Sequence, residues 1–296
     1  MRFLYQYPEA VGPSGRMTDA GDVAEVARAV EAAGLDGLAF TEHPAPSAKW
    51  LAAGGHQTLD PFVALGAAAA GSRSIRLVTY LSVAAYRNPF LLGKAAATVD
   101  IVSGGRFVLG LGTGYQKAEF RALGVDFERR NEAFDEVLEI LPRYWNGEVI
   151  TTTGLDFEAR DVVGLPGPLQ NPIPIWVGGN SRLAARRAVR VQGWMPMLTA
   201  EVVSNTTRTA HIGDVETLAS RIRETRDLAG DRADSIDVLV TCPDHSIAEP
   251  GVDVERHRDF LGRLAEAGVT WVGVQGHTTS LDSTIESIEH VATSYR

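Results

Sequence analysis

Residues 75–111 read IRLVTYLSVAAYRNPFLLGKAAATVDIVSGGRFVLGL, and the pattern of this stretch decides the fold. Two short β-rich apolar runs, at 75–83 and 106–111, enclose an apolar, alanine-rich segment at 89–102 that is followed by two glycines. A glycine pair directly after such a segment is typical of a helix end. Apolar runs without alternation are typical of parallel strands that helices cover. The stretch therefore predicts one strand–helix–strand unit.

The same unit recurs along the whole chain. Strands are expected at 2–7, 36–41, 75–83, 106–111, 173–177, 193–197, 236–242 and 269–275. The helices that follow them are expected at 19–33, 59–70, 89–102, 129–145, 181–191, 214–228, 254–267 and 281–292. Eight consecutive units predict an α/β fold of the (β/α)₈ TIM-barrel type. A doubly wound sheet, which usually has fewer units, is the alternative.

We predict a single domain over residues 1–296, because no low-complexity linker interrupts the series. An insertion at about 146–172 is expected to form a hairpin from 148–152 and 157–162. Lid-type loops are expected at about 42–58 and 199–213. Both lid-type loops follow strands, and in a barrel such loops lie at the face that carries the active site.

Charge and composition exclude several classes of function. With 28 Lys and Arg against 37 Asp and Glu, the net charge is −9, which argues against nucleic acid or an anionic membrane as partner. The single cysteine, Cys242, excludes an intramolecular disulfide and is interpreted as a small buried hydrophobe. No metal-ligand histidine spacing occurs, so no metal is expected. Without a signal peptide or a membrane-spanning segment, the expected location is the cytoplasm.

Polar residues at the ends of the predicted strands are the first candidates for chemistry. His43 follows Glu42 at the end of the second strand, where an imidazole could act as acid or base or simply bond a neighbouring carbonyl. Tyr80 and Tyr86 could stack on an aromatic ligand, or they could fill the core with Arg87 as a structural ion-pair partner. His277 closes the eighth strand and is a further candidate for a substrate contact.

Two glycine-rich strand ends could bind a ligand. The run 110–114 reads GLGTG, which lacks the spacing and the later acidic residue of a dinucleotide-binding fingerprint. Residues 176–181 read WVGGNS and open a helix, where backbone N–H groups suit a phosphate and Ser181 could equally be a simple N-cap. Arginines on this helix are candidates for contact with an anionic group or form a solvated face. They are Arg182, Arg186, Arg187 and Arg190.

Four stretches together resemble the bacterial luciferase-like family of flavin and deazaflavin oxidoreductases. They are FTEHP at 40–44, the segment 76–89, SGGRFVLGLGTG at 103–114 and PIWVGGNS at 174–181. The resemblance implies a (β/α)₈ barrel that binds a tricyclic redox cofactor. The segment HQTLDP at 56–61 and the Thr-Gly step at 113–114 are most similar to the branch that uses coenzyme F420, with flavin mononucleotide (FMN) as the alternative cofactor.

The resemblance also implies roles for individual residues. His43 matches a catalytic acid or base, and Glu42 an acidic residue that contacts the cofactor. Tyr80 and Leu81 fall where deazaflavin members have a non-prolyl cis peptide whose bulge presses on the ring. Thr113 and Gly114 would lie along the ring. The phosphate would be held by Val177, Gly178, Gly179 and Ser181.

One position departs from the family pattern. The sugar-phosphate dehydrogenases of the family have a catalytic glutamate just after the Thr-Gly step, where this chain has Tyr115, so glucose-6-phosphate is not assigned as the substrate. Trp50, His56, Tyr115 and His277 are the expected substrate contacts.

The expected activity is F420-dependent hydride transfer to or from a small organic molecule. One alternative is an FMN-dependent monooxygenase that receives reduced flavin from a reductase. The other is a non-catalytic flavin- or deazaflavin-binding protein. A homodimer is expected from the family resemblance.

Overall fold

The computed structural model describes residues 1–10 and 15–296, and within them parallel strands close into a barrel. The barrel strands are β1 (Arg2–Gln6), β2 (Gly37–Phe40), β3 (Arg76–Thr79), β5 (Phe107–Gly112), β8 (Ile175–Gly178), β9 (Gly193–Met195), β10 (Asp237–Thr241) and β11 (Trp271–Gln275). Their order around the barrel is β3-β2-β1-β11-β10-β9-β8-β5, and β5 pairs again with β3. The predicted TIM barrel is confirmed, and the closure rules out the doubly wound alternative.

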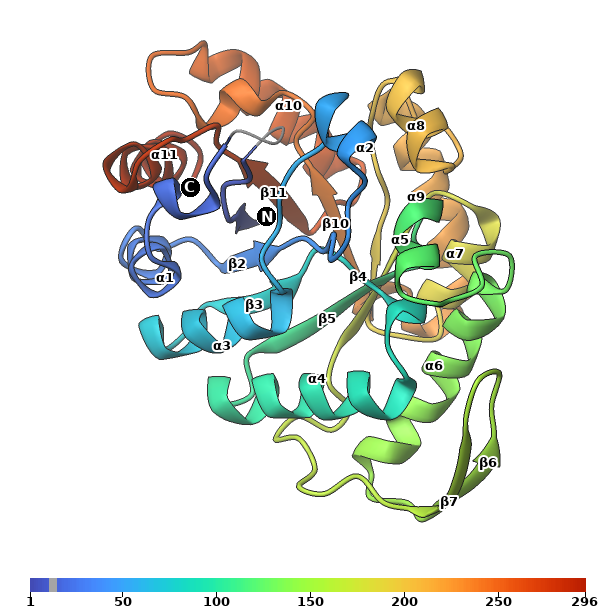
Figure 1. Ribbon diagram of the computed structural model, residues 1–296. Helices are drawn as coiled ribbons and strands as arrows, with labels where there is room; N and C mark the ends of the chain where they lie inside the picture. The colour runs from blue at the N-terminus through green and yellow to red at the C-terminus, as the bar shows by residue number, and fades with distance from the viewer. Residues whose placement is uncertain (11–14) are drawn as a thin grey trace.

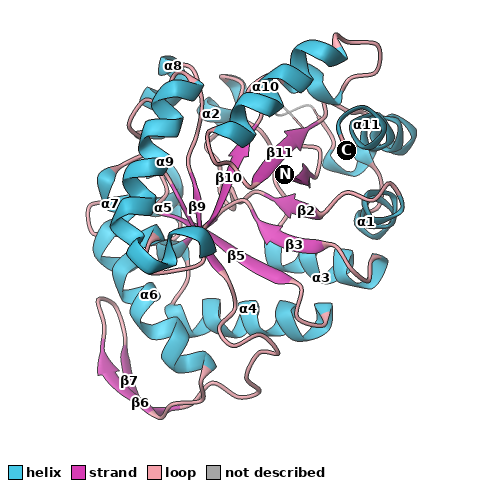
Figure 2. Ribbon diagram, turned by 180° about the vertical axis from the view of Figure 1, so that it is seen from behind, coloured by secondary structure: helices cyan, strands magenta, loops and turns pink. Residues whose placement is uncertain are grey.

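Helices surround the strands (Figures 1 and 2). The helices that follow the barrel strands are α1 (Val23–Ala32), α3 (Pro61–Gly71), α4 (Pro89–Ser103), α6 (Arg130–Trp145), α7 (Arg182–Ala188), α9 (Val215–Ala229), α10 (Val254–Glu266) and α11 (Leu281–Tyr295). Short 3₁₀ turns occur at Met17–Ala20, Ala84–Tyr86, Gly230–Ser235 and His245–Ala248.

Side-chain caps decide where the helices begin. In the stretch that decides the fold, Asn88 accepts a hydrogen bond from the N–H of Phe90 at the start of α4, and Gly104 ends the helix at φ +71°. The expected helix at 19–33 is wrong at its start. Gly21 adopts φ +110°, and Asp22 caps a helix that begins only at Val23, after a separate 3₁₀ turn.

The third strand differs from its expected range of 75–83. Strand β3 ends at Thr79, the Tyr80–Leu81 peptide is cis, and a two-residue strand β4 (Ser82–Val83) pairs with β5 separately. The family resemblance placed a non-prolyl cis peptide at this position, and the structure has it. The pattern of apolar residues alone did not indicate the interruption.

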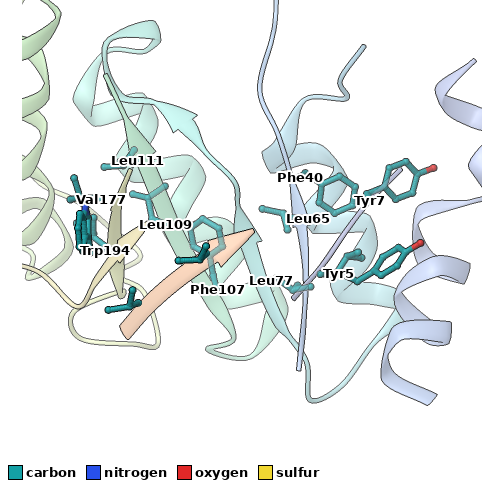
Figure 3. Packing of buried hydrophobic residues seen from close by; sticks show 14 of the residues in the cluster. Tyr5, Tyr7, Phe40, Leu65, Leu77, Phe107, Leu109, Leu111, Val177 and Trp194 are labelled. Atoms are coloured by element: carbon teal, nitrogen blue, oxygen red, sulfur yellow. The ribbon is translucent and has the colours of Figure 1, made fainter. Parts of the chain in front are cut away.

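The core has two main layers. One cluster fills the barrel interior with one side chain from each barrel strand: Leu4, Ala39, Val78, Val108, Trp176, Met195, Leu239 and Trp271. The larger cluster lies between the strands and the surrounding helices, and Figure 3 shows part of it. Phe107, Leu109 and Leu111 of β5 belong to this cluster and alternate along the strand with Val108, which belongs to the barrel interior. The interior layer closes the barrel below the strand ends, so space above it is open to a ligand.

The connecting segments contain structure of their own. The predicted hairpin of the insertion is confirmed as β6 (Ile150–Thr153) and β7 (Glu158–Val162), which lie outside the barrel beside α6 (Figure 2). The two lid-type loops were expected to be irregular, but they carry helices α2 (Ala48–Ala52) and α8 (Glu201–Thr207). A further short helix, α5 (Lys117–Ala122), follows β5.

Candidate functional site

A cavity of about 750 Å³ opens at the carboxyl ends of the barrel strands. Every barrel strand contributes to its floor at or just after its last residue, through Gln6, Thr41, Tyr80, Gly112, Gly178, Met195, Thr241 and Gln275. Its volume lies in the usual range of small-molecule sites, roughly 300–1,000 Å³. The cavity therefore occupies the position at which barrel enzymes bind their substrates.

The side chain of Leu81 projects over two strand ends that have no side chains of their own. A Cβ atom on Gly112 would lie 2.3 Å from Leu81 Cδ1, and one on Gly178 would lie 2.2 Å from Leu81 Cδ2. Both distances are far below van der Waals contact, so glycine is required at both positions for Leu81 to sit where it does. Within the glycine run at 110–114, Gly112 thus accommodates Leu81, a protein side chain that itself lines the cavity.

Glu42 holds the backbone that follows the cis peptide. Its Oε2 accepts hydrogen bonds from Ser82 Oγ at 2.9 Å and from the N–H of Val83 at 2.7 Å. Its Oε1 accepts from the guanidinium of Arg87, which also contacts Asp60 Oδ2 at 3.0 Å. The ion-pair role considered for Arg87 is confirmed. Glu42 lines the cavity while both of its oxygens have protein partners, and its contact with a cofactor stays a prediction.

His43 lies on the cavity wall between two polar partners. Its Nδ1 lies 3.0 Å from Glu119 Oε2, and its Nε2 lies 3.4 Å from the hydroxyl of Tyr115. The rings of Trp50 and His56 pack around it, with centroids 4.5 Å and 5.1 Å from that of His43. These contacts hold the imidazole in one orientation on the wall of the cavity.

Glu119, on α5, is a site residue that the sequence did not reveal. Its side chain is 0% exposed, and it accepts hydrogen bonds from the hydroxyl of Tyr86 at 3.0 Å and the N–H of Ala45 at 3.2 Å. Burial, together with the nearby Glu119 charge, raises the pKa of Tyr86, and burial raises the pKa of Tyr115 to about 12. Both phenols are therefore protonated at neutral pH, and that of Tyr86 donates its proton to Glu119.

A second carboxylate, Glu9, was also missed and anchors another part of the wall. Thr41 Oγ1 donates to its Oε1, Gln275 Nε2 donates to its Oε2 at 3.2 Å, and His56 Nδ1 lies 2.9 Å from the same oxygen. Burial of His56 opposes its protonation, but the Glu9 carboxylate outweighs that effect and raises the pKa of His56. The wall therefore combines carboxylates with imidazoles.

The predicted phosphate-binding residues gather on a different part of the cavity. Gly179 adopts φ +111°, and Ser181 caps α7 by accepting from the N–H of Ala184 at 3.1 Å. The residues of the phosphate and ring predictions that line the cavity are Tyr80, Leu81, Thr113, Gly114, Val177, Gly178, Gly179 and Ser181. The structure thus brings the whole predicted cofactor set into one cavity.

Of the two interpretations of the helix arginines, contact with an anionic group or a solvated face, the structure favours the solvated face for Arg182, Arg186 and Arg190. Arg187 lines the cavity, but it is buried against Phe134 and forms an ion pair with Asp135 at 2.7 Å. The other arginines of this helix are exposed and lie outside the cavity lining. Arg208, at the end of α8, lines the cavity instead and has no ion pair within the described part of the chain.

The predicted substrate contacts separate into two groups. His56 and Tyr115 line the cavity beside His43, whereas Trp50 packs against the His43 ring and is not part of the lining. His277 also lines the cavity, but its ring stacks on His245 and not on His43. The centroids of the His277 and His245 rings are 5.0 Å apart. Burial, assisted by His277, lowers the pKa of His245.

The thiol of Cys242 and the arrangement of potential metal ligands bear on other kinds of chemistry. Burial raises the pKa of Cys242 to about 11, so its thiol is protonated at neutral pH. Among residues 1–10 and 15–296, no group of three or more His, Cys, Asp or Glu side chains is arranged to hold a metal ion. In the same part of the chain, no helix has both the length and the apolar content that a membrane span requires.

Comparison with protein families and curated relatives gives a consistent result. The family model described as "Luciferase-like monooxygenase" matches residues 1–243. An uncharacterized protein of Mycobacterium tuberculosis is 28% identical over 286 residues, which cover 91% of this chain and 87% of that protein. The F420-dependent glucose-6-phosphate dehydrogenase of Nakamurella multipartita is 29% identical over 246 residues, which cover 81% of this chain and 66% of that enzyme.

Solved structures share the fold at low sequence identity. An F420-dependent secondary alcohol dehydrogenase in complex with an F420-acetone adduct matches with a TM-score of 0.74 and 17% identity, over 100% of this chain and 99% of that one. The long-chain alkane monooxygenase LadA matches with a TM-score of 0.75 and 16% identity, over 100% of this chain and 92% of that one. At these identities the likeness shows the fold alone.

Proposed function

Because the chain belongs to the luciferase-like monooxygenase family, we propose that it is an oxidoreductase that transfers hydride between coenzyme F420 and a small organic substrate. The observation that carries the proposal is that one cavity contains both the Leu81 bulge with its glycine neighbours and the His43–Glu119 pair. The first feature suits a flat ring, and the second suits transfer of the proton that accompanies a hydride.

The residues present fit a deazaflavin. Gly112 and Gly178 leave Leu81 as the projecting group on this part of the floor. Gly114 and Gly179 adopt positive φ angles at which a residue with a side chain would be strained, so these positions also contribute backbone alone. Tyr80, Leu81, Thr113 and Gly114 would adjoin the ring, and the segment 177–181 would hold the phosphate. A bound deazaflavin supplies two-electron hydride chemistry. Arg208 would contact the anionic tail, since it is the cavity-lining arginine left without an ion pair in the described residues.

His43 is the residue placed to handle a proton. Its Nδ1 is occupied by Glu119, whereas its Nε2 is directed to the Tyr115 hydroxyl at 3.4 Å. Tyr115 keeps its proton because burial raises its pKa to about 12. The backbone N–H of His43 donates to Thr58 Oγ1 at 2.9 Å, which ties together the two ends of the loop that carries α2 and helps to shield the site from water.

Titration of the purified protein with coenzyme F420 and with FMN, side by side, tests the cofactor. We expect F420 to bind at least tenfold more tightly, as measured by fluorescence quenching. R208A should weaken F420 binding, whereas R186A, which alters an exposed arginine outside the cavity, should not. Tight FMN binding without F420 binding would overturn the proposal.

The second candidate function is an FMN-dependent monooxygenase, which the description of the matching family favours. It requires reduced flavin, supplied by a reductase, and dioxygen. Product analysis under ¹⁸O₂ separates the two reactions, because a monooxygenase incorporates one labelled oxygen atom and hydride transfer incorporates none. A protein that binds its cofactor tightly and turns over no substrate in a broad panel would instead be a non-catalytic binding protein.

A further inference from the structure

Glu119 is a fully buried carboxylate whose three hydrogen-bond partners come from two other segments of the chain. Ala45, in the loop after β2, donates its N–H to Oε1 at 3.2 Å. Tyr86, beyond the cis peptide, donates its hydroxyl to Oε2 at 3.0 Å, and His43 Nδ1 lies 3.0 Å from the same oxygen. The side chain is 0% exposed, so water does not compete for these positions.

The arrangement determines which nitrogen of His43 carries the proton. A carboxylate accepts hydrogen bonds and does not donate them, so the short contact requires N–H at Nδ1. A neutral imidazole has only one N–H, which leaves a lone pair on Nε2. We propose that Glu119 is a positioning residue that fixes the Nδ1–H tautomer of His43 and thereby reserves Nε2 for proton exchange in the cavity. This inference rests on the proposed function, because proton exchange at Nε2 has a role only if the protein catalyses hydride transfer.

The proton balance follows from this tautomer. With a substrate that carries a hydroxyl group, Nε2 accepts the hydroxyl proton while the carbon loses hydride, with its two electrons, to the oxidised cofactor. The imidazole then holds two protons and is stabilised by the Glu119 carboxylate. In the reverse direction, Nε2 returns its proton to the carbonyl oxygen as the carbon gains hydride. With the other tautomer, the neutral ring could not accept a proton at Nε2, the nitrogen beside the hydroxyl of the cavity-lining Tyr115.

The same molecule contains a second buried histidine beside a carboxylate. His257, on α10, is 2% exposed, its Nε2 lies 3.2 Å from Asp244 Oδ2, and its Nδ1 lies 3.1 Å from the Tyr295 hydroxyl. Arg256 Nη2, which can only donate, lies at the same distance of 3.2 Å from Nε2, so the contacts of His257 do not select one tautomer. His257 is outside the cavity lining, so it serves as an internal reference.

Long-range ¹H–¹⁵N correlation spectra of histidine-labelled protein without cofactor test the proposal directly. At a pH at which the rings are neutral, we expect a protonated Nδ1 for His43, with the resonances of His43 and His257 assigned from H43Q and H257Q. A neutral His43 with its proton on Nε2 would overturn the proposal. This measurement does not depend on which cofactor the protein uses, so its failure is distinguishable from failure of the proposed function.

The E119Q variant tests the consequence. A glutamine that accepts from Ala45 through its carbonyl oxygen presents an NH₂ group to His43, which should move the proton to Nε2 and lower kcat by about 100-fold or more, with KM changed by only a few-fold. Y86F removes one donor to Glu119 and should keep the wild-type tautomer, with kcat lowered less than tenfold.

E136Q is the matched control for the chemical change. Glu136 accepts from the N–H of Leu155 at 2.8 Å, next to the hairpin, so the same substitution there should alter neither the tautomer of His43 nor kcat. If circular dichroism shows that E119Q is folded, and the variant keeps the wild-type tautomer and kcat, Glu119 is not a positioning residue. If E119Q fails to fold, the spectrum of the wild-type protein still decides the tautomer.

Discussion

Two walls of the cavity are built in opposite ways. The acidic wall comprises Glu9, His43, His56, Tyr115 and Glu119, whose side chains contact one another. The glycine wall comprises Gly112, Gly114, Gly178 and Gly179, which contribute backbone alone. Glu9, His43 and His56 come from the segments after β1 and β2, whereas the glycines end or follow β5 and β8. Tyr115 and Glu119 also follow β5 and reach His43 from there, and Leu81 follows β3. One wall fixes the positions of protons, and the other leaves space that a ligand can fill.

The two walls are connected through Glu42. Its carboxylate follows β2, on the side of the acidic wall, but its hydrogen bonds go to Ser82 and Val83, which support the Leu81 bulge. The comparison therefore predicts separable effects. Substitutions in the acidic wall should change turnover, those in the glycine wall should change cofactor affinity, and those at the Glu42 contact should change stability.

The largest effect is expected at His43. In H43A, the group that exchanges the proton is lost, so kcat should fall by about 10²–10⁴-fold. The Kd of the cofactor should change by no more than about threefold, because the glycine wall is unaltered. Steady-state kinetics and a cofactor titration on the same preparation check both numbers. An unchanged rate would remove His43 from the mechanism. H277A provides a comparison at a second histidine of the cavity, which contacts His245 and not His43.

The next largest effect is expected from Arg87, the cationic partner of buried Glu42. R87A leaves a carboxylate that is 1% exposed without its ion pair, which should lower the free energy of unfolding by about 3 kcal/mol. Urea unfolding measures the change. The matched control is R160A, since Arg160 and Glu158 form an exposed pair whose loss should lower stability by less than about 1 kcal/mol. Equal effects of the two substitutions would contradict the connecting role of Glu42.

The glycine wall predicts a smaller effect on binding. In G178A, the new Cβ would meet Leu81 Cδ2 at 2.2 Å, so Leu81 must move and the Kd of the cofactor should rise about tenfold, which is about 1.4 kcal/mol. G262A, in α10, is the control, because a Cβ there meets no atom within 4 Å and alanine favours helix. Unchanged affinity in G178A would show that the position of Leu81 does not matter for the ligand.

The order of elements could be predicted from the sequence because it depends on local patterns. Each barrel strand is a short apolar run, and caps such as Asn88 and Gly104 are visible in the sequence. The helix at Lys117–Ala122 was missed because it is a short segment that tertiary contacts hold in place. The break after Thr79 was missed by pattern alone, because both sides of it are equally apolar, and it came only from the family resemblance.

The site residues that lie in sequence motifs were predicted. The site residues that only the fold brings together were missed. The segments around His43, Thr113 and Gly178 are adjacent to strand ends, and all three residues line one cavity. Glu119 lies 76 residues from His43, and no local signal pairs them. Likewise, Arg187 could be placed on a helix, but its ion pair with Asp135 depends on how α6 packs against α7.

The smallest expected effect concerns His56 and pH. The Glu9 carboxylate raises the pKa of His56 in the folded protein above its ordinary value of about 6.5, although burial opposes the shift. The resulting stabilisation is fully present below about pH 6.5, where both states bind the proton, and is lost as pH rises through the folded value. The difference in unfolding free energy between wild type and H56Q should thus shrink, by less than about 1 kcal/mol, between pH 6 and pH 9. E9Q should abolish this trend because it removes the charge that causes it, whereas a difference that stays constant with pH would mean that Glu9 does not stabilise the charged form of His56.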